Sequence, residues 1–260
     1  MTRWVAFATL AGLVSIVVLL SARASTRHVE TLSRHRSPTA EFADGAGHLD
    51  AIDASDSPSP SPDVSETALL ANLTVSQGLF AAVLIAGVAL ANVPMAALGV
   101  GTASFSQWEV LAVGVGAGVV IAAANTLAGV LAEAVGADPG RALRELLTPD
   151  SRRGWVLLLG VVLPVIAGFE ELLFRGILIG AFAVGFDTSP WLLAVGSSVL
   201  FAAGHGAQGR LGIAVTGLLG MVLAAVFVLT ESLLVVVIAH YIVNAAEFAL
   251  SATRYGPYGR

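Results

Sequence analysis

One stretch decides how this chain is expected to fold: GWVLLLGVVLPVIAGFEELLFRGILIGAFA, residues 154–183. It is about 30 residues long and almost wholly apolar, whereas a helix needs only roughly 20 such residues to cross a bilayer. Three charged side chains interrupt it, Glu170, Glu171 and Arg175. A charge at the centre of a membrane helix costs about 2.5–3.5 kcal/mol on insertion scales, so these residues need partners or a function.

The composition of the whole chain indicates a polytopic membrane protein. Of its 260 residues, 56% are hydrophobic and only 12% are charged, against about a quarter charged in soluble domains. Further apolar segments cover residues 4–20, 75–100, 109–135, 190–206, 211–229 and 232–250. In lipid, only helices satisfy the backbone groups of consecutive segments of this kind. We therefore predict an all-α membrane helix bundle with about seven transmembrane helices.

The chain divides into four parts. Residues 1–21 are predicted to form a membrane anchor, with a cleaved signal peptide as the alternative because an A-x-A-like site ends at Ala24. Residues 22–74 are rich in Ser, Pro and Asp. Such a segment buries too little apolar surface to become ordered, which predicts a disordered linker. The helical core covers 75–250, and 251–260 form a tail.

The distribution of arginine predicts an orientation. With the N-terminus outside, every other loop faces the cytoplasm, and beyond the linker these loops and the tail hold Arg141, Arg144, Arg152, Arg153, Arg210, Arg254 and Arg260. The loops on the other side, near 101–108, 184–190 and 230–231, hold none. Because cytoplasmic loops are enriched in basic residues, we expect a multi-pass protein of the plasma membrane with its C-terminus in the cytoplasm.

Several kinds of site are excluded. The chain has no cysteine, which removes disulfides, thiolate metal sites and cysteine nucleophiles. It has no basic tract interleaved with aromatic residues, so no nucleic-acid partner is expected. The HExxH motif of helical zinc proteases is absent, as are the GxSG pattern of rhomboid-like serine sites and the GxGD signature of intramembrane aspartyl proteases.

The charged residues of 154–183 differ in the partners that they can reach. Glu171 and Arg175 are four residues apart on one helix face and are expected to form an ion pair. Glu170 is turned about 100° from Glu171 around the helix, so it needs a partner from another helix. The segment is also longer than a span requires, so either its first turns protrude from the membrane or Pro164 bends it.

Two later helices offer partners for Glu170. His205 follows Phe201 by four residues near the end of one helix, and His240 precedes Asn244 by four in the middle of another. A single membrane histidine is more often a helix–helix hydrogen bond than a catalyst. A carboxylate, two imidazoles and a carboxamide that met in one cavity could instead activate water and stabilise an oxyanion.

The ordered set EE-x3-R, F-x3-H and H-x3-N resembles the CPBP family. This family, also called ABI, comprises the type II CAAX prenyl endopeptidases and bacteriocin-processing or immunity proteins. The resemblance covers about residues 150–250. It implies an intramembrane endopeptidase that hydrolyses a peptide bond of a membrane-associated peptide or protein, of the prenylated CAAX type or bacteriocin-like.

The resemblance also implies a role for each motif residue. Glu170 would be the general base that takes a proton from water, and His205 would bind and orient that water. His240 and Asn244 would stabilise the oxyanion. The supporting residues would be Glu171, Arg175 and Phe201, the first two holding the site in shape and the last packing beside His205.

The mechanism and even the activity have alternatives. A metal-free glutamate mechanism is favoured and no metal is assigned, but members of the family have also been described as metalloproteases. Glu170, His205 and His240 are the set that would then hold zinc. A catalytically silent scaffold or immunity protein would keep the same polar cluster. A proton-coupled transporter is the least favoured, because no inverted repeat is visible.

Overall fold

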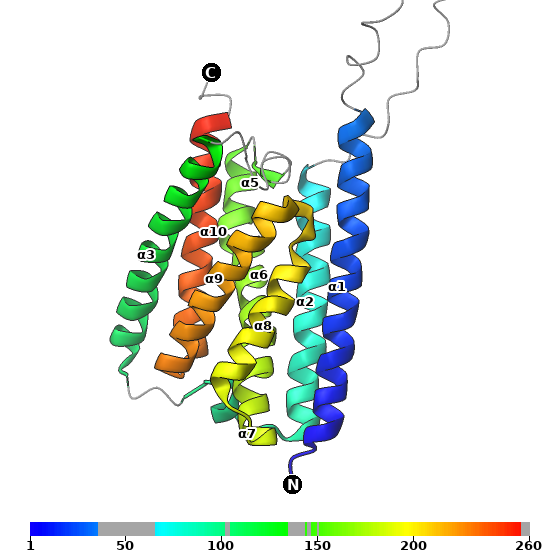
Figure 1. Cartoon of the computed structure of the whole chain (residues 1–260), viewed down its shortest axis with the longest axis vertical. Helices are drawn as coiled ribbons and strands as arrows, with labels where there is room; N and C mark the ends of the chain where they lie inside the picture. The colour runs from blue at the N-terminus through cyan, green and yellow to red at the C-terminus, as the bar shows by residue number, and fades with distance from the viewer. Residues whose placement is uncertain (36–65, 102–104, 135–143, 145–146, 150, 256–260) are drawn as a thin grey trace, which may run out of the picture.

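The computed structural model describes residues 1–35, 66–101, 105–134, 144, 147–149 and 151–255, and these segments are almost entirely helical (Figure 1). Six helices among them are long and apolar enough to cross a membrane. A shorter apolar helix, α8 (Pro190–Gly204), joins them in the bundle. The predicted all-α bundle of about seven helices is thus confirmed.

Most of the long helices are separate elements that alternate in direction. Figure 1 shows the N-terminus at the lower end of the bundle and the C-terminus at the upper end. The separate long helices are α1 (Trp4–His35), α2 (Glu66–Ala91), α3 (Gln107–Ala134), α9 (Gly209–Thr230) and α10 (Leu233–Tyr255). Two short 3₁₀ turns, η2 (Met95–Leu98) and η5 (Gly206–Gln208), lie at opposite ends of the bundle.

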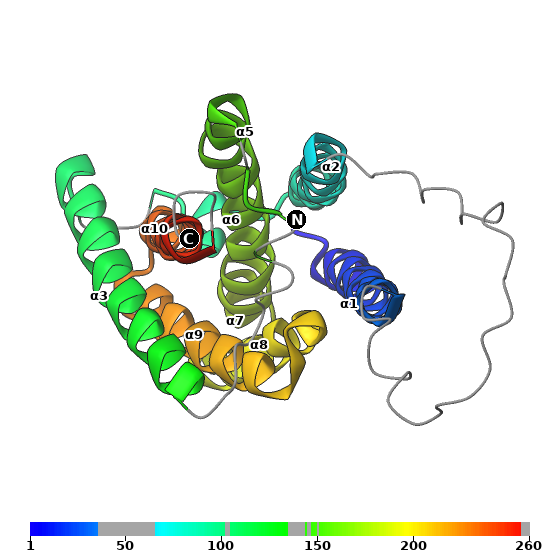
Figure 2. The same cartoon turned by 90° about the horizontal axis from the view of Figure 1, so that it is seen from above.

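The sixth span is one continuous helical run from Arg152 to Phe186. Its α-helical turns alternate with two wider π-helical stretches, in the order α5 (Arg152–Leu157), η3 (Leu158–Val162), α6 (Leu163–Glu171), η4 (Leu172–Ala181) and α7 (Phe182–Phe186). Viewed from above, this run lies between a group of α3, α9 and α10 and a pair of α1 and α2 (Figure 2). It therefore places Glu170, Glu171 and Arg175 inside the bundle.

Pro164 explains the first of these wide turns. The N–H of Leu163 bonds to the carbonyl of Leu158, five residues back. The next residue in that register, Pro164, has no N–H to give to the carbonyl of Leu159. The hydroxyl of Tyr241 on α10 donates to that carbonyl instead, at 3.2 Å. The helix passes the proline without a break, because a neighbouring helix satisfies the freed backbone group.

Glycines let α3 and α10 approach closely. A Cβ added at Gly114 would lie 2.9 Å from Cβ of Ile238, and one added at Gly118 would lie 2.9 Å from Cβ of Ile242 and 3.0 Å from Cα of Ala239. The two glycines form a G-x-x-x-G pattern, which brings membrane helices together by removing side chains from the contact. The α3–α10 pair forms one wall of the site.

Three predicted boundaries were wrong. Residues 22–35 were assigned to a disordered linker but continue α1, because the stretch contains neither proline nor glycine and an established helix propagates readily. Residues 66–74 were also assigned to the linker but belong to α2. The middle of the predicted linker, 36–65, lies outside the described residues, as do 256–260 of the predicted tail.

The third boundary is the end of the second membrane segment, predicted at residue 100. The helix ends at Ala91, and Asn92 adopts a left-handed conformation with φ of 54°. Pro94 follows, and the residue before a proline is disfavoured in the helical conformation. The remaining residues form η2 and a turn that ends with Gly99 at φ of 74°.

Candidate active site

The charged residues of the central helix are paired inside the bundle. Nη1 of Arg175 donates to Oε1 of Glu171 at 2.9 Å, and both side chains are almost completely buried. Nη2 of Arg175 donates to the backbone carbonyl of Gly220 on α9, at 3.0 Å. The ion pair expected from the four-residue spacing is therefore present, and it also ties the central helix to α9.

Two carboxylates hold His240 from opposite sides of its ring. Oε1 of Glu171 lies 2.6 Å from Nδ1, and Oε2 of Glu170 lies 3.7 Å from Nε2. His240 is only 3% exposed. Glu170 and Glu171 thus reach one histidine although they point from different sides of their helix. His240 on α10 is thus the partner from another helix that we expected for Glu170.

The partners of His240 fix its tautomer. Oε1 of Glu171 already accepts a hydrogen bond from Arg175, which requires an acceptor oxygen. The same oxygen accepts from His240, so Nδ1 carries the proton and Nε2 faces Glu170. A histidine oriented by a carboxylate on one nitrogen keeps the other nitrogen available for chemistry.

Phe201 on α8 lies between the other functional side chains. Its ring centroid is 4.6 Å from that of His205 and 6.0 Å from that of His240. The guanidinium carbon of Arg175 sits 4.7 Å from the centre of the same ring, a cation–π distance. Phe201 is 1% exposed, so this fully buried ring separates the Glu171–Arg175 ion pair from His205.

His205 ends α8 and is also fixed through one nitrogen. Its Nδ1 lies 2.8 Å from the carbonyl oxygen of Phe201. A carbonyl can only accept, so Nδ1 carries the proton and Nε2 of the neutral ring is an acceptor. Such a nitrogen can accept a hydrogen bond from a water molecule.

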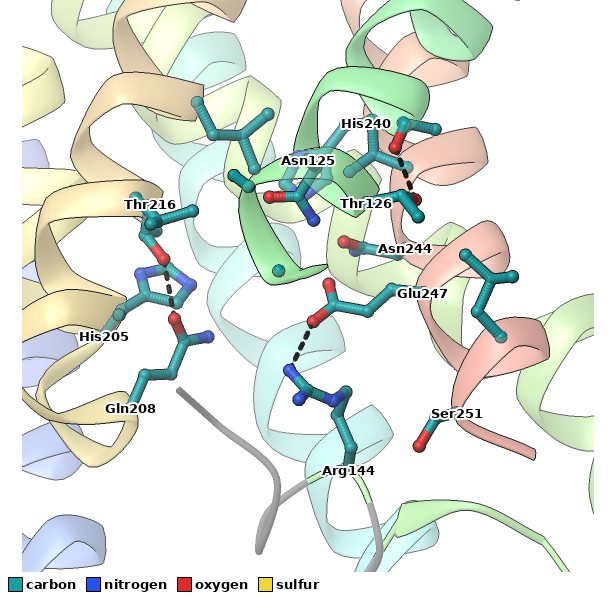
Figure 3. Close-up of a pocket in the computed structure, with 18 of the residues that line it drawn as sticks. Asn125, Thr126, Arg144, His205, Gln208, Thr216, His240, Asn244, Glu247 and Ser251 are labelled. Carbon is teal, nitrogen blue, oxygen red and sulfur yellow. Dashed lines mark hydrogen bonds and ion pairs between the residues drawn. The ribbon is translucent and has the colours of Figure 1, made fainter. Parts of the chain in front are cut away.

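An open pocket of about 140 Å³ adjoins these residues, between α3, α9 and α10. Its wall includes Phe201, His205, His240 and Asn244, so three of the four predicted catalytic residues meet there (Figure 3). Glu170 is not among the residues that line the pocket and reaches it through His240. Within the described chain, Glu170 makes no hydrogen bond or ion pair with His205.

Sequence reasoning missed several polar residues of this pocket. Gln208 accepts a hydrogen bond from Thr216 at 2.7 Å, and Arg144 forms a 2.9 Å ion pair with Glu247 at the pocket mouth (Figure 3). The pocket is also lined by Asn125 and Thr126 of α3. A signal for Asn125 was available, because an amide is rare within an apolar membrane segment.

The donor set does not form a metal centre. Across the described segments, no three His, Cys, Asp or Glu side chains are placed to share one metal ion. The engaged Nδ1 atoms of His240 and His205 leave Nε2 of each ring free, which is an arrangement that metal ligands also use. Glu170, His205 and His240 are nevertheless not grouped closely enough in the described residues to share one ion, and we derive no step through a metal.

Comparison with known proteins bears on this site. Residues 152–246 match a family described as type II CAAX prenyl endopeptidase Rce1-like. These residues, called the Rce1-like segment below, are thus similar to that family. No curated protein and no solved structure matches the chain.

The Rce1-like segment begins at the central helix and ends within α10. It therefore contains all the residues of the three motifs, and its similarity to this family indicates a protease. The segment does not include α1, α2 or α3, although α3 supplies one wall of the pocket.

Proposed function

We propose that the protein is an intramembrane endopeptidase that cleaves a membrane-associated peptide, of the prenylated CAAX type, by a glutamate mechanism. The observation that supports it most is the placement of Glu170 and Glu171 on the two nitrogens of His240, beside a pocket that Asn244 and His205 also line. A base, an oriented imidazole and a neutral amide donor are the groups that peptide hydrolysis by water requires.

In the first step, Glu170 acts as the base that deprotonates water. Nε2 of His205 accepts a hydrogen bond from the water, Glu170 takes one of its protons, and the water oxygen attacks the carbonyl carbon of the peptide. The carbonyl oxygen becomes an oxyanion, to which Asn244 donates through Nδ2. When the intermediate collapses, the C–N bond breaks and the leaving amine takes the proton that Glu170 removed.

His240 links the base to the oxyanion. Since Nδ1 donates to Glu171, Nε2 can donate to the oxyanion only when the ring carries a second proton. Glu170 lies 3.7 Å from Nε2. A small movement that brings these two atoms within hydrogen-bond distance lets His240 share the proton that Glu170 takes from water, so that the oxyanion donor appears as the negative charge develops. Arg175 and Phe201 act on this chemistry only by holding Glu171 and the two rings in place.

A cleavage assay tests the proposal. The purified protein in lipid nanodiscs is incubated with an internally quenched peptide that ends in a farnesylated CAAX sequence. We expect many cleavages per protein molecule, with products identified by mass spectrometry. Binding of the peptide without turnover would instead support the silent scaffold. Proton flux into proteoliposomes without any cleavage would support the transporter.

The same assay addresses the metal alternative. The glutamate mechanism predicts full activity after dialysis against a chelator and no stoichiometric zinc in the folded protein by elemental analysis. Loss of activity on chelation, restored by zinc alone, would overturn the metal-free mechanism.

A further inference from the structure

One face of α3 lies along α10. The first half of this face packs tightly against α10, and the second half lines the pocket. At Gly114 and Gly118 the two helices are in tight contact, and Ile121 is buried one turn later. Asn125 is seven residues after Gly118 and so returns to the same face. At that level the contact opens, and Asn125 lines the pocket together with Gly129.

Asn125 lies well inside the membrane segment. It is nine residues before the end of α3, about 14 Å along the helix axis. Asn244 is eleven residues before the end of α10, about 16 Å along its axis. Figure 3 shows both carboxamides beside the same pocket, on different helices.

The neighbours of Asn125 use their hydrogen-bonding groups within the protein, whereas Asn125 does not. Thr126 donates to the carbonyl of Ala122, and Thr216 donates to Gln208 on the α9 side of the pocket. In the described part of the chain, the carboxamide of Asn125 has no hydrogen-bond partner, and it is only partly buried. An amide without a partner is costly in an apolar surrounding, so its place on this face indicates a ligand.

We infer that Asn125 is a substrate-binding residue, which holds the main chain of the peptide against the α3–α10 wall of the pocket, the wall that also carries Asn244. Its Nδ2 donates to a peptide carbonyl and its Oδ1 accepts from a peptide N–H, the two groups that every residue of an extended peptide offers. The inference rests on the proposed function for its substrate. It adds a contact from α3, outside the Rce1-like segment.

The rigid packing of α3 suits this role. The glycine contacts with α10 fix the position of α3 about two to three turns before Asn125. Asn125 and Asn244 therefore face the bound peptide from two helices that are locked together. A peptide held at two points of this wall keeps its scissile carbonyl at the oxyanion donors, which lowers the entropic cost of reaching the transition state.

Binding and cleavage are measured separately to test the inference. Binding of a fluorescent peptide with a farnesylated CAAX terminus is followed by anisotropy in the Glu170→Gln background, and cleavage is followed in the otherwise native protein. Asn125→Leu keeps the volume of the side chain and removes both hydrogen-bonding groups. Gln107→Leu, the same amide-to-apolar change at an exposed position of α3 that does not line the pocket, is the matched control.

We expect Asn125→Leu to weaken peptide binding by about threefold to tenfold, the effect of one or two hydrogen bonds, and to raise KM more than it lowers kcat. Gln107→Leu should change neither binding nor KM. The thermal unfolding temperature of Asn125→Leu should not fall. A lower unfolding temperature with unchanged KM would make Asn125 a structural residue and overturn the inference.

The outcomes separate this inference from the proposed function. If the native protein binds the peptide through Asn125 but never cleaves it, the binding role holds and the endopeptidase proposal fails. If it cleaves the peptide and Asn125→Leu has native KM and binding, the endopeptidase stands and the inference is wrong. If the protein neither binds nor cleaves the peptide, both are wrong.

Discussion

Glu171 contacts both the buried guanidinium and the buried imidazole of the site. It accepts from Arg175 on its own helix and from His240 on α10, while Arg175 also reaches the backbone of α9. Removing one member of a buried ion pair leaves the other charge uncompensated, which costs more than the pair contributes. Glu171 therefore supports the fold and the orientation of His240 together.

Glu171→Gln is expected to lower the free energy of unfolding by about 3–5 kcal/mol, because it leaves the guanidinium of Arg175 buried without a counter-charge. Thermal unfolding of the purified variant in detergent measures the loss. The double variant Glu171→Leu/Arg175→Met should recover most of the stability while cleavage stays absent, because His240 is no longer oriented. A single variant as stable as the native protein would contradict the charge pairing.

At the scale of elements, the α3–α10 contact leaves different space for a side chain at two glycines of α3. A Cβ at Gly118 would lie within 3.0 Å of α10, whereas one at Gly116 would have nothing within 4 Å. Alanine is favoured over glycine in a helix by about 1 kcal/mol, so any loss of stability at Gly118 reports the contact with α10.

We predict that Gly118→Ala lowers the free energy of unfolding by about 1–3 kcal/mol, the usual cost of overpacking. Gly116→Ala, two residues away on the free side, should be neutral or stabilising. Chemical denaturation of both variants in the same detergent gives the comparison. Equal effects of the two substitutions would show that α3 and α10 do not pack as described.

The wide turn before Pro164 gives a second prediction at this scale. Tyr241→Phe removes the donor to the carbonyl of Leu159 and leaves that carbonyl unsatisfied. The expected loss is about 1 kcal/mol of unfolding free energy, and the unfolding temperature measures it. An unchanged unfolding temperature would mean that another group satisfies the carbonyl.

The sequence predicted the elements better than the contacts between them. Helical spacing was enough for the Glu171–Arg175 pair, because both residues lie on one helix. The contact between Glu171 and His240 joins residues 69 positions apart, and local spacing carries no information on which helix faces which. The π-helical turns were not foreseen either, and they redirect side chains along the central helix. Asn125 was missed because the motifs begin after α3.

For the whole molecule, the described arginines favour one end of the bundle. Arg152, Arg153 and Arg210 lie at the end where the C-terminus emerges, and Arg3 alone among the described arginines lies at the other end (Figure 1). The arrangement fits the proposed orientation, with the C-terminal end in the cytoplasm. The pocket mouth, with the Arg144–Glu247 pair, would then open towards the cytoplasm.

The absence of cysteine makes this orientation directly testable. Ser189 is exposed at the start of α8, and Ala207 is partly exposed in η5 at the other end. A membrane-impermeant maleimide should label Ser189→Cys in intact cells and Ala207→Cys only after permeabilisation. The opposite pattern would invert the proposed topology.

The packing of α1 favours a retained anchor over a cleaved signal peptide. Phe7, Ala11 and Val14 are buried in the same hydrophobic cluster as Phe169 and Phe201. Loss of this helix would expose an apolar face beside the site. The choice between anchor and signal peptide remains a prediction, which the intact mass of the mature protein decides.

Hydrolysis by a water molecule that Glu170 deprotonates is the central claim, and cleavage of the farnesylated peptide by Glu170→Gln tests it most directly. Asp187→Asn is the matched acid-to-amide control, since Asp187 is exposed, far from the pocket and in a left-handed conformation that asparagine tolerates. We predict that Glu170→Gln folds normally and loses about 10²–10⁴-fold in kcat, while Asp187→Asn keeps native kcat. Native kcat for Glu170→Gln would contradict the account.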